Sequence, residues 1–370
     1  MENKLFVGIA TLTGTVIGAG FLGIPYVVAK SGLLIGIIHM AVICAMMMLI
    51  NLMLGEICLS SKQQHQLPGY ASKYLGRKTK IFIFIASIIG YYSALVAYLI
   101  GEGESLSFIF AGDKSYALIA GLIFWFFLAF LTFGGIRKFK KIEPFAVIAV
   151  FLITLLIGLV NLPKIQLKNL SLINTNYLFL PFGVILFSFL GITSIPEVRR
   201  VLKGNEKLMK KSIILGSLIP FFVYLLFTII VLGLYGEGVE EVATISFGKI
   251  VTLLGIFTMF TAFSALSLAL EDTLRFDFNL KFKTAWFLTI FIPLLLFLII
   301  KIFNLASFVK ILGFGGSISG GLLSIAILLI HEHLQDRKRE RKSEFKVRLP
   351  LIIKVLFICL FIVGILYEFL

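Results

Sequence analysis

Residues 14–25 read Gly-Thr-Val-Ile-Gly-Ala-Gly-Phe-Leu-Gly-Ile-Pro, and they interrupt an apolar run that extends from residue 5 to residue 29. Proline removes one helical hydrogen bond and clashes with the preceding turn, while glycine lets the backbone turn away at low steric cost. At membrane depth such a break is tolerated only where the freed backbone groups line a site or are buried in protein. The stretch therefore predicts a discontinuous membrane helix.

A second break of the same kind lies in the middle of the chain. Residues 187–197 read Phe-Ser-Phe-Leu-Gly-Ile-Thr-Ser-Ile-Pro-Glu, again inside an apolar run. Gly20 precedes Pro25 by five positions, and Gly191 precedes Pro196 by the same five. The equal spacing indicates that the two breaks are related structural features.

The composition of the whole chain is that of a membrane protein. Of 370 residues, 59% are hydrophobic and 14% are charged, whereas soluble domains are about 45–50% apolar and about 25% charged. This composition excludes a soluble enzyme, a disordered scaffold and a secreted disulfide module. The three cysteines lie inside apolar runs and form no disulfide framework. A span-sized window finds eleven apolar segments: residues 5–29, 33–59, 81–101, 115–133, 144–162, 177–198, 212–235, 248–270, 284–303, 305–330 and 350–369.

The two breaks fall in the first and sixth segments, which are five spans apart. Each span reverses the direction in which the chain crosses the membrane, so after five spans the second half is inverted relative to the first. Paired breaks in corresponding positions indicate an inverted-repeat transporter with a site at the membrane midplane. The sequence thus predicts an all-α polytopic membrane protein with about eleven transmembrane helices. We expect one domain, residues 1–370, with a first repeat (5–162), a second, inverted repeat (177–330) and an extra C-terminal span (350–369). The alternative is that both breaks are kinks that serve helix packing.

Lysine and arginine are divided unequally between alternate connections. One set of connections carries 26 of these residues and the other carries seven. Because basic connections stay on the cytoplasmic side, we predict a multi-pass protein of the cell membrane with its N-terminus in the cytoplasm and its C-terminus outside. The net charge of +15 is then a topology signal, and no nucleic-acid partner is expected.

Several of these stretches carry a family resemblance. Residues 14–25 look like the first-span motif of amino-acid permeases, and residues 194–200, Gly204-Asn205 and residues 216–220 are similar to the sixth and seventh spans of the aromatic amino-acid permease family. The resemblance covers spans one to seven. It implies the LeuT-type fold of the amino acid/polyamine/organocation superfamily, with its 5+5 inverted repeat. It also implies a secondary active transporter, a symporter that moves an aromatic or neutral amino acid.

The resemblance implies a substrate site made of main-chain groups. Backbone amides of the first break would receive the substrate carboxylate, namely those near Gly18, Ala19 and Gly20. Carbonyl groups of both breaks would face the ammonium group, namely those around Thr13 and those of Phe187, Ser188 and Phe189. The physics agrees, because half-helix N-termini attract anions and exposed C-terminal carbonyls attract cations.

Side chains of spans three, six and eight would select the substrate. Our candidates are Tyr91, Tyr92, Phe189, Thr193 and Ser264. Each has an ordinary alternative role, since tyrosines in spans often anchor at the membrane interface and phenylalanines often face lipid or the protein core.

The family resemblance favours a proton as the coupling ion, whereas the sequence itself leaves sodium open, and no other cofactor is expected. A sodium site in this fold would use carbonyl oxygens near Gly14 and Ile17 and a hydroxyl of Thr261 or Ser264. A proton-coupled permease instead needs an acid or a displaced lysine charge at depth. The acids considered lie near the cytoplasmic ends of spans, where a solvated carboxylate costs little: Glu56, Glu143, Glu197, Glu271 and Asp272.

Two remaining motifs receive ordinary interpretations. His331 and His333 form no metal set and are expected to be solvated. The glycine-rich run from Gly313 to Gly321 is expected to serve close helix packing first and gating second.

The predicted partners are a small amino-acid substrate and the lipid bilayer, with the oligomeric state left open. The first alternative function is transport of another small nitrogenous metabolite. The second is a channel, which would need a pore lined with charged or carbonyl rings. An enzyme is not expected, since the spans contain no nucleophile with its base, no metal set and no paired acids.

Overall fold

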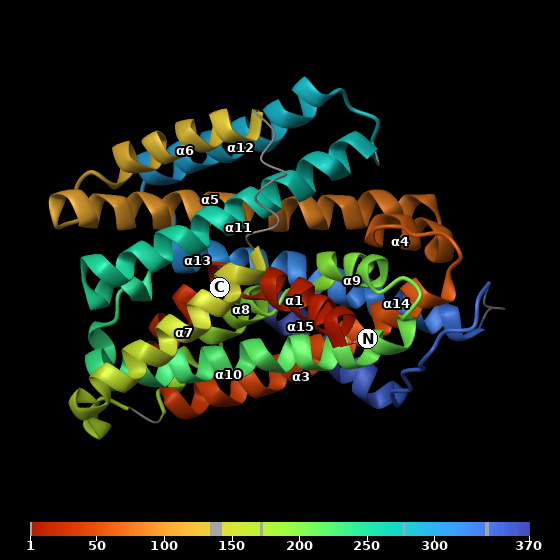
Figure 1. Ribbon diagram of the computed structural model, residues 1–370, viewed down its shortest axis with the longest axis horizontal. Helices are drawn as coiled ribbons and strands as arrows, with labels where there is room; N and C mark the ends of the chain where they lie inside the picture. Colours follow the sequence, from red (N-terminus) through yellow and green to blue (C-terminus); the bar gives the residue numbers. More distant parts are fainter. Residues whose placement is uncertain (1, 134–142, 171–172, 277, 337–339) are drawn as a thin grey trace.

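The computed structural model describes residues 2–133, 143–170, 173–276, 278–336 and 340–370 (Figure 1). Throughout these ranges the regular elements are helices. The longer ones are α1 (Glu2–Val16), α2 (Ile24–Ser31), α3 (Leu33–Ser60), α4 (Leu67–Leu75), α5 (Arg77–Ala111), α6 (Ala117–Phe133), α7 (Glu143–Asn161), α8 (Leu180–Ser188), α9 (Ile195–Val201), α10 (Met209–Tyr235), α11 (Lys249–Phe276), α12 (Phe282–Ile302), α13 (Phe308–Phe314), α14 (Gly321–Asp336) and α15 (Leu351–Tyr367).

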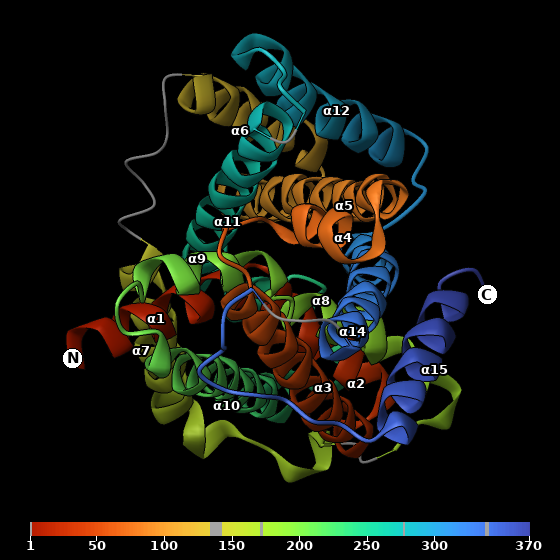
Figure 2. The ribbon, with the colours of Figure 1, turned by 90° about the vertical axis from the view of Figure 1, so that its right-hand side faces the viewer.

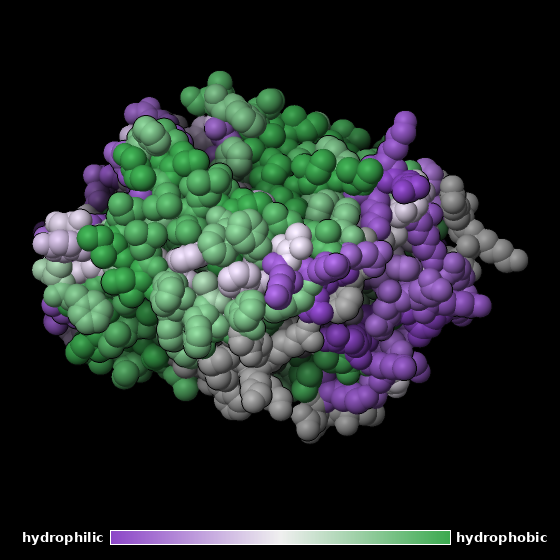
Figure 3. All heavy atoms as spheres, turned by 90° about the horizontal axis from the view of Figure 1, so that it is seen from above, coloured by the Kyte–Doolittle hydropathy of each residue, from purple (hydrophilic) through white to green (hydrophobic). Residues whose placement is uncertain are grey.

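The described helices have the length and hydropathy of membrane spans. Seven are long and apolar enough to cross a membrane, eight if the bent pair α1 and α2 forms one span, and three shorter apolar helices accompany them. Hydrophobic residues cover the middle of the molecule, whereas hydrophilic residues gather at the end that carries α4 and α9 (Figures 1 and 3). The chain is therefore an all-α polytopic membrane protein, while the count of eleven transmembrane helices stays a prediction.

The broken helices lie inside the bundle. α1 packs against α9 and α10, and α8 packs against α2, α3 and α13. α5 and α11 run beside one another along the long axis, and α6 and α12 cover α5 on its outer side (Figures 1 and 2). This arrangement places both breaks between α5 and α11 on one side and α3 and α10 on the other.

Three elements differ from the sequence-based expectation. α5 continues beyond the predicted segment 81–101 to Ala111, so Glu102 lies inside a helix. α4 occupies part of a stretch predicted as a connection. The tenth apolar segment is divided by a π-helix, Gly315–Gly320, between α13 and α14. Short π-helical turns are rare and frequently occur at functional sites.

The expectation that His331 is solvated was wrong. The residue is fully buried on α14, and its Nε2 lies 3.0 Å from Oε2 of Glu56 on α3. The same carboxylate oxygen accepts a hydrogen bond of 2.7 Å from the backbone N–H of Val347. The solvated carboxylate expected for Glu56 was also wrong, because this side chain is fully buried too. Both residues instead attach the segment before α15 to the end of the bundle.

Candidate functional site

The first break separates α1 from α2. The helix ends at Val16, and a 3-10 turn, Gly20–Gly23, leads into α2, so the two halves are inclined by 48°. Pro25 occupies the first turn of α2, where its missing N–H has no intrahelical partner to lose. The N–H of Gly18 turns back to the carbonyl oxygen of Val16 at 2.8 Å. Ala19 and Gly20 thus stand at the N-terminal end of the turn, where backbone N–H groups lack partners within the turn.

The second break separates α8 from α9. α8 ends at Ser188, a 3-10 turn covers Ile192–Ser194, and Pro196 lies in the first turn of α9. The hydroxyl of Ser188 donates to the carbonyl of Val184 at 2.8 Å, so it stabilises the end of its own helix. The sequence therefore predicted both breaks correctly, and their local chemistry is the same.

The two breaks meet in the centre of the molecule. A Cβ atom at Gly20 would lie 2.7 Å from Oγ of Ser188 and 2.8 Å from Cδ1 of Phe187. Glycine is thus required at this position because the second break approaches it too closely for any side chain. The contact brings the N-terminal end of one half-helix next to the C-terminal end of another, so opposite ends of two helix dipoles face the same space.

Tyr224 of α10 links the C-terminal ends of α1 and α8. Its fully buried hydroxyl lies 2.7 Å from the carbonyl oxygen of Val16 and 3.0 Å from that of Ser188. One O–H group donates to one of these oxygens at a time, so the other carbonyl keeps its lone pairs free for a cation.

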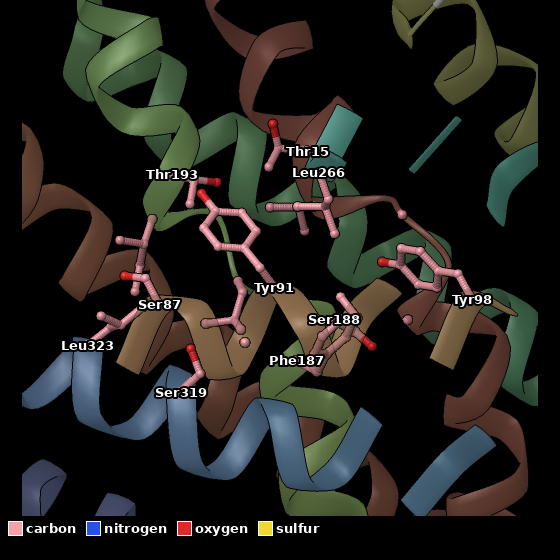
Figure 4. Close-up of a pocket in the computed structure, with 17 residues that line it drawn as sticks. Thr15, Ser87, Tyr91, Tyr98, Phe187, Ser188, Thr193, Leu266, Ser319 and Leu323 are labelled. Carbon is pink, nitrogen blue, oxygen red and sulfur yellow. The ribbon is translucent and has the colours of Figure 1, made fainter. Parts of the chain in front are cut away.

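A cavity of about 100 Å³ lies beside the meeting point (Figure 4). It is lined by both breaks, one face of α5, α11, the π-helix and α14. Tyr91 projects into it with its hydroxyl pointing toward Thr193 (Figure 4). Polar atoms are supplied by the following residues: Thr15, Ser87, Tyr91, Tyr98, Ser188, Thr193 and Ser319.

The cavity continues toward one end of the molecule. A second cavity of about 410 Å³ shares Ser87, Tyr91 and Thr193 with the first and extends past the start of α4 and the end of α11. Glu197 and Arg200 form a 2.7 Å ion pair at its lining. The central site is therefore open toward the end of the molecule that carries the basic connections.

Six of the predicted substrate-site residues line the central cavity: Gly18, Gly20, Tyr91, Phe187, Ser188 and Thr193. The other five lie around it without lining it. Ala19 is buried behind the cavity, and its backbone is within hydrogen-bonding contact of the Tyr98 hydroxyl. Thr13 donates to the carbonyl of Gly216 at 3.4 Å.

The remaining three candidates point elsewhere in this conformation. The hydroxyl of Tyr92 donates to the carbonyl of Leu288 on α12 at 3.2 Å. Phe189 packs edge-on against Tyr224 with ring centroids 5.2 Å apart. Ser264 donates to the carbonyl of Phe260 in its own helix at 2.8 Å. Their roles in substrate selection stay predictions.

The candidate sodium ligands lie near one another, but their polar groups form hydrogen bonds within their own segments. Thr261 donates to the carbonyl of Thr258 at 3.0 Å, while Ser264 bonds within α11 as described above. The backbone N–H of Ile17 donates to Thr13 at 2.7 Å. A Cβ atom at Gly18 would lie 3.7 Å from Cβ of Ala262, so α11 packs against the first break at the level of these hydroxyls. A hydroxyl oxygen that donates its proton can still accept or ligate, so the arrangement is compatible with the proposed set, which includes the carbonyl of Gly14.

Sequence reasoning missed five polar residues of the site: Thr15, Ser87, Tyr98, Tyr224 and Ser319. Tyr98 had an available signal, since Ser87, Tyr91, Ala94 and Tyr98 recur at helical spacing and share one face of α5. Ser319 lies in the glycine-rich run, where Gly316 packs so closely that a Cβ would lie 2.0 Å from the carbonyl oxygen of Gly183. Close packing is therefore confirmed for that run. Nothing in the sequence pointed to Tyr224.

Comparison with known proteins agrees with this architecture. The model of the tryptophan/tyrosine permease family matches residues 1–368. The chain is 26% identical to the tyrosine-specific transport system 1 of Haemophilus influenzae over 343 residues, which cover 85% of this chain and 84% of the relative. It is 28% identical to glutamine transporter 2 of Aliivibrio fischeri over 244 residues, which cover 63% of this chain and 62% of the relative.

Two solved structures share the fold. A nucleobase-cation-symport-1 family transporter, in a closed conformation with bromovinylhydantoin bound, has a TM-score of 0.65 at 12% identity, covering 98% of this chain and 91% of its own. The manganese transporter of Eremococcus coleocola has a TM-score of 0.62 at 13% identity, covering 99% of this chain and 86% of its own. The fold is thus the LeuT-type transporter fold.

Proposed function

The chain belongs to the tryptophan/tyrosine permease family, which makes it a multi-pass membrane permease and not an enzyme, and from this premise we propose that it transports an amino acid at the cavity between its two broken helices. The observation that carries the proposal is the contact between Gly20 and Ser188, which joins an N-terminal half-helix end to a C-terminal one beside the cavity. A zwitterion has one charge for each of these ends.

The substrate carboxylate binds at the first break in this proposal. Gly20 lines the cavity and offers its N–H group at the start of the 3-10 turn, and Ala19 precedes it with its own backbone in contact with the Tyr98 hydroxyl. The ammonium group faces the carbonyl end of α8, where Phe187 and Ser188 line the cavity. Charge-assisted hydrogen bonds of this type are about twice as strong as neutral ones.

The side chain of the substrate is aromatic or neutral. Related proteins are named for tyrosine and glutamine, and Tyr91 with Phe187 offers ring surfaces for an aromatic group. Tyr91 and Thr193 add hydroxyls that suit a polar side-chain end, so tyrosine is the first candidate and glutamine the second.

The open side of the site faces the cytoplasm in our proposal. The second cavity reaches the end of the molecule where the basic connections lie, and basic connections stay inside. The N-terminus is then cytoplasmic and the C-terminus external, and this conformation is inward-open. Transport is driven by a proton or a sodium gradient.

The test is uptake by purified protein in proteoliposomes. Labelled L-tyrosine is taken up and challenged with a panel of common amino acids, with L-glutamine as a second labelled probe. We expect saturable uptake that aromatic or neutral amino acids inhibit. Flux that does not saturate would indicate a channel, and inhibition by non-amino-acid nitrogen compounds alone would indicate another nitrogenous metabolite. Either result contradicts the proposal.

A further inference from the structure

A second polar centre lies in α5, one helical turn beyond the cavity. Glu102 is fully buried, and neither of its carboxyl oxygens has a hydrogen-bond partner. Among the residues that the structure describes, it is the one buried acidic side chain with both oxygens in this condition. A backbone group of Phe260 on α11 lies close enough to the Glu102 carboxyl to interact with it. An ion in such a place is costly, so native proteins retain a buried acid there for a function.

The surrounding helices exclude water from Glu102. Gly101 and Gly103 flank it, and a Cβ atom at Gly103 would lie 2.3 Å from the carbonyl oxygen of Ala117 on α6. A Cβ atom at Gly101 would lie 2.6 Å from Sδ of Met259 on α11. The glycines let α6 and α11 close over the carboxyl from two sides. A neutral, protonated acid fits this packing far better than a carboxylate.

The next acid along the same helix has the opposite environment. Glu104 lies 3.4 Å from Nζ of Lys114 and 3.5 Å from Nζ of Lys301. Lys114 also pairs with Glu240 at 2.6 Å. Two carboxyls only two residues apart therefore have different environments. Glu104 is an anion bound by lysines, whereas Glu102 lies in an isolated apolar site. The lysines satisfy Glu104 and leave Glu102 without a counter-charge.

Within the described part of the chain, the helices packed on α5 place no charged partner against Glu102. α6 contains no ionisable residue, and α11 contains none between Lys249 and Glu271. α12 contributes Lys301, which binds Glu104, and Lys283 at its opposite end, and α13 contributes Lys310. The ionisable groups of α4 and α14 lie at the opposite end of α5, and the π-helix has none. On α5 itself the neighbouring groups are Glu104 and Tyr98. None of these groups forms an ion pair or a side-chain hydrogen bond with the Glu102 carboxyl.

Glu102 is connected to the substrate site through α5 and α11. Tyr98 precedes it by four residues and so lies on the same face of α5, and Tyr98 lines the cavity and contacts the Ala19 backbone at the first break. Phe260, whose backbone acts on the carboxyl, accepts the hydroxyl hydrogen bond of Ser264. A rearrangement of α11 against α5 would therefore change the surroundings of Glu102 and of the first break together.

We infer that Glu102 is the carboxyl that carries the coupled proton. This inference rests on the proposed transport function and selects the proton from the two coupling ions. The carboxyl takes up a proton from water when the site is open to the outside, and the neutral acid is enclosed as α6 and α11 close over it. The structure, in which the site is open toward the cytoplasm while α6 and α11 still enclose Glu102, precedes proton release. When α5 and α11 then separate, the O–H bond ionises, the proton passes to water on the cytoplasmic side, and the carboxylate remains hydrated until the cycle reverses.

The experiment separates exchange from accumulation in proteoliposomes, with labelled L-tyrosine and L-glutamine as probes. Wild-type protein is expected to show counterflow without a gradient and accumulation when a pH gradient is imposed. A gradient of about two pH units supports at most about 100-fold accumulation for one proton, since each unit is a tenfold ratio. Glu102→Gln, which imitates the neutral acid, keeps counterflow and loses gradient-driven accumulation. Glu104→Gln is the matched control and keeps both.

Four outcomes with the wild type and the glutamine variants would overturn the inference. They are accumulation by Glu102→Gln at the wild-type level, loss of counterflow by a folded Glu102→Gln, loss of proton-driven accumulation by Glu104→Gln with Glu102 intact, and wild-type accumulation driven by sodium alone. Glu102→Asp provides a second variant that keeps a carboxyl. Glu102→Asp is expected to retain gradient-driven accumulation, with the dependence of accumulation on pH displaced from that of the wild type. A pH dependence that coincides with that of the wild type contradicts the inference, even if Glu102→Gln does not fold. Absence of wild-type counterflow with either probe would instead refute the proposed function.

Discussion

The hydroxyl of Tyr224 lies 2.7 Å from the carbonyl oxygen of Val16, a residue 208 positions earlier in the chain. Val16 is the last residue of α1, and the same hydroxyl also lies 3.0 Å from the last carbonyl of α8, that of Ser188. The last carbonyl groups of α1 and α8 thus share the hydroxyl of Tyr224 as their hydrogen-bond donor. The geometry of the site depends on α10, a helix with no break of its own.

Replacement of Tyr224 by phenylalanine is expected to loosen both helix ends. The variant removes the one O–H donor that two buried carbonyls share, which costs about 1–3 kcal/mol of stability. We expect a lower Tm in a thermal-unfolding assay in detergent and a slower initial rate of uptake. Tyr92→Phe is the matched control, because that hydroxyl donates to Leu288 on α12, away from the breaks. Equal effects of both variants would show that the bridge at Tyr224 has no special role.

Replacement of Gly20 by alanine is expected to weaken substrate binding. The added Cβ would lie 2.7 Å from Oγ of Ser188, so the two breaks must move apart. Loss of one charged hydrogen bond to the substrate is worth about 1.5–3 kcal/mol, or about ten- to a hundredfold in affinity. Scintillation-proximity binding measures the change. Gly238→Ala is the control, since nothing lies within 4 Å of a Cβ at that position, and a similar loss there would argue against the close approach as the cause.

Removal of the substrate carboxylate is expected to abolish competition. The N–H groups of the first break, that of Gly20 among them, would lose their charged acceptor, and a donor left without its hydrogen bond carries a penalty in free energy. Tyramine should therefore inhibit labelled tyrosine uptake at least about tenfold less well than tyrosine does. Equal potency of the amine and the amino acid would mean that the first break does not bind a carboxylate.

The orientation can be measured with an impermeant thiol reagent on intact cells. Lys203 and Lys249 are both exposed and lie in connections of opposite predicted side. In a background without the exposed thiol of Cys359, Lys249→Cys should react from outside, whereas Lys203→Cys should react only after permeabilisation. The reverse pattern would invert the topology and with it the inward-open assignment of the cavity.

The segment before α15 is expected to loosen in acid. A hydrogen bond from Lys73, at 2.7 Å, holds the pKa of the exposed Glu340 carboxyl below its ordinary value of 4.5. A depressed pKa means that this contact stabilises the folded state above pH 4.5 and is lost as the pH falls below it. Hydrogen exchange of the backbone after Glu340, corrected for the intrinsic rate, should rise in that range. Glu340→Gln should show the increase already at neutral pH, and protection that is unchanged in both cases would exclude the contact as an attachment point.

The broken helices themselves were predictable from sequence because their causes are local. Gly20 with Pro25, and Gly191 with Pro196, act on the backbone within a few residues of themselves. Hydropathy is equally local, so the positions of the helices followed from it. The end of α5 was misplaced because Glu102 and Glu104 look like the start of a polar connection, whereas packing by α6 and α11 buries one and lysines pair with the other.

By itself the sequence determined an all-helical membrane protein with two related helix breaks and a basic end, since hydrophobicity, backbone strain and charge are properties of each stretch of chain. Only the tertiary structure decided which polar groups meet. Tyr224 bridges carbonyls of α1 and α8, His331 pairs with Glu56 across 275 positions, and Glu102 has no counter-charge. The physical reason is that burial and pairing are set by the distance between groups in space, and in a bundle of long helices the nearest groups belong to segments far apart in the chain.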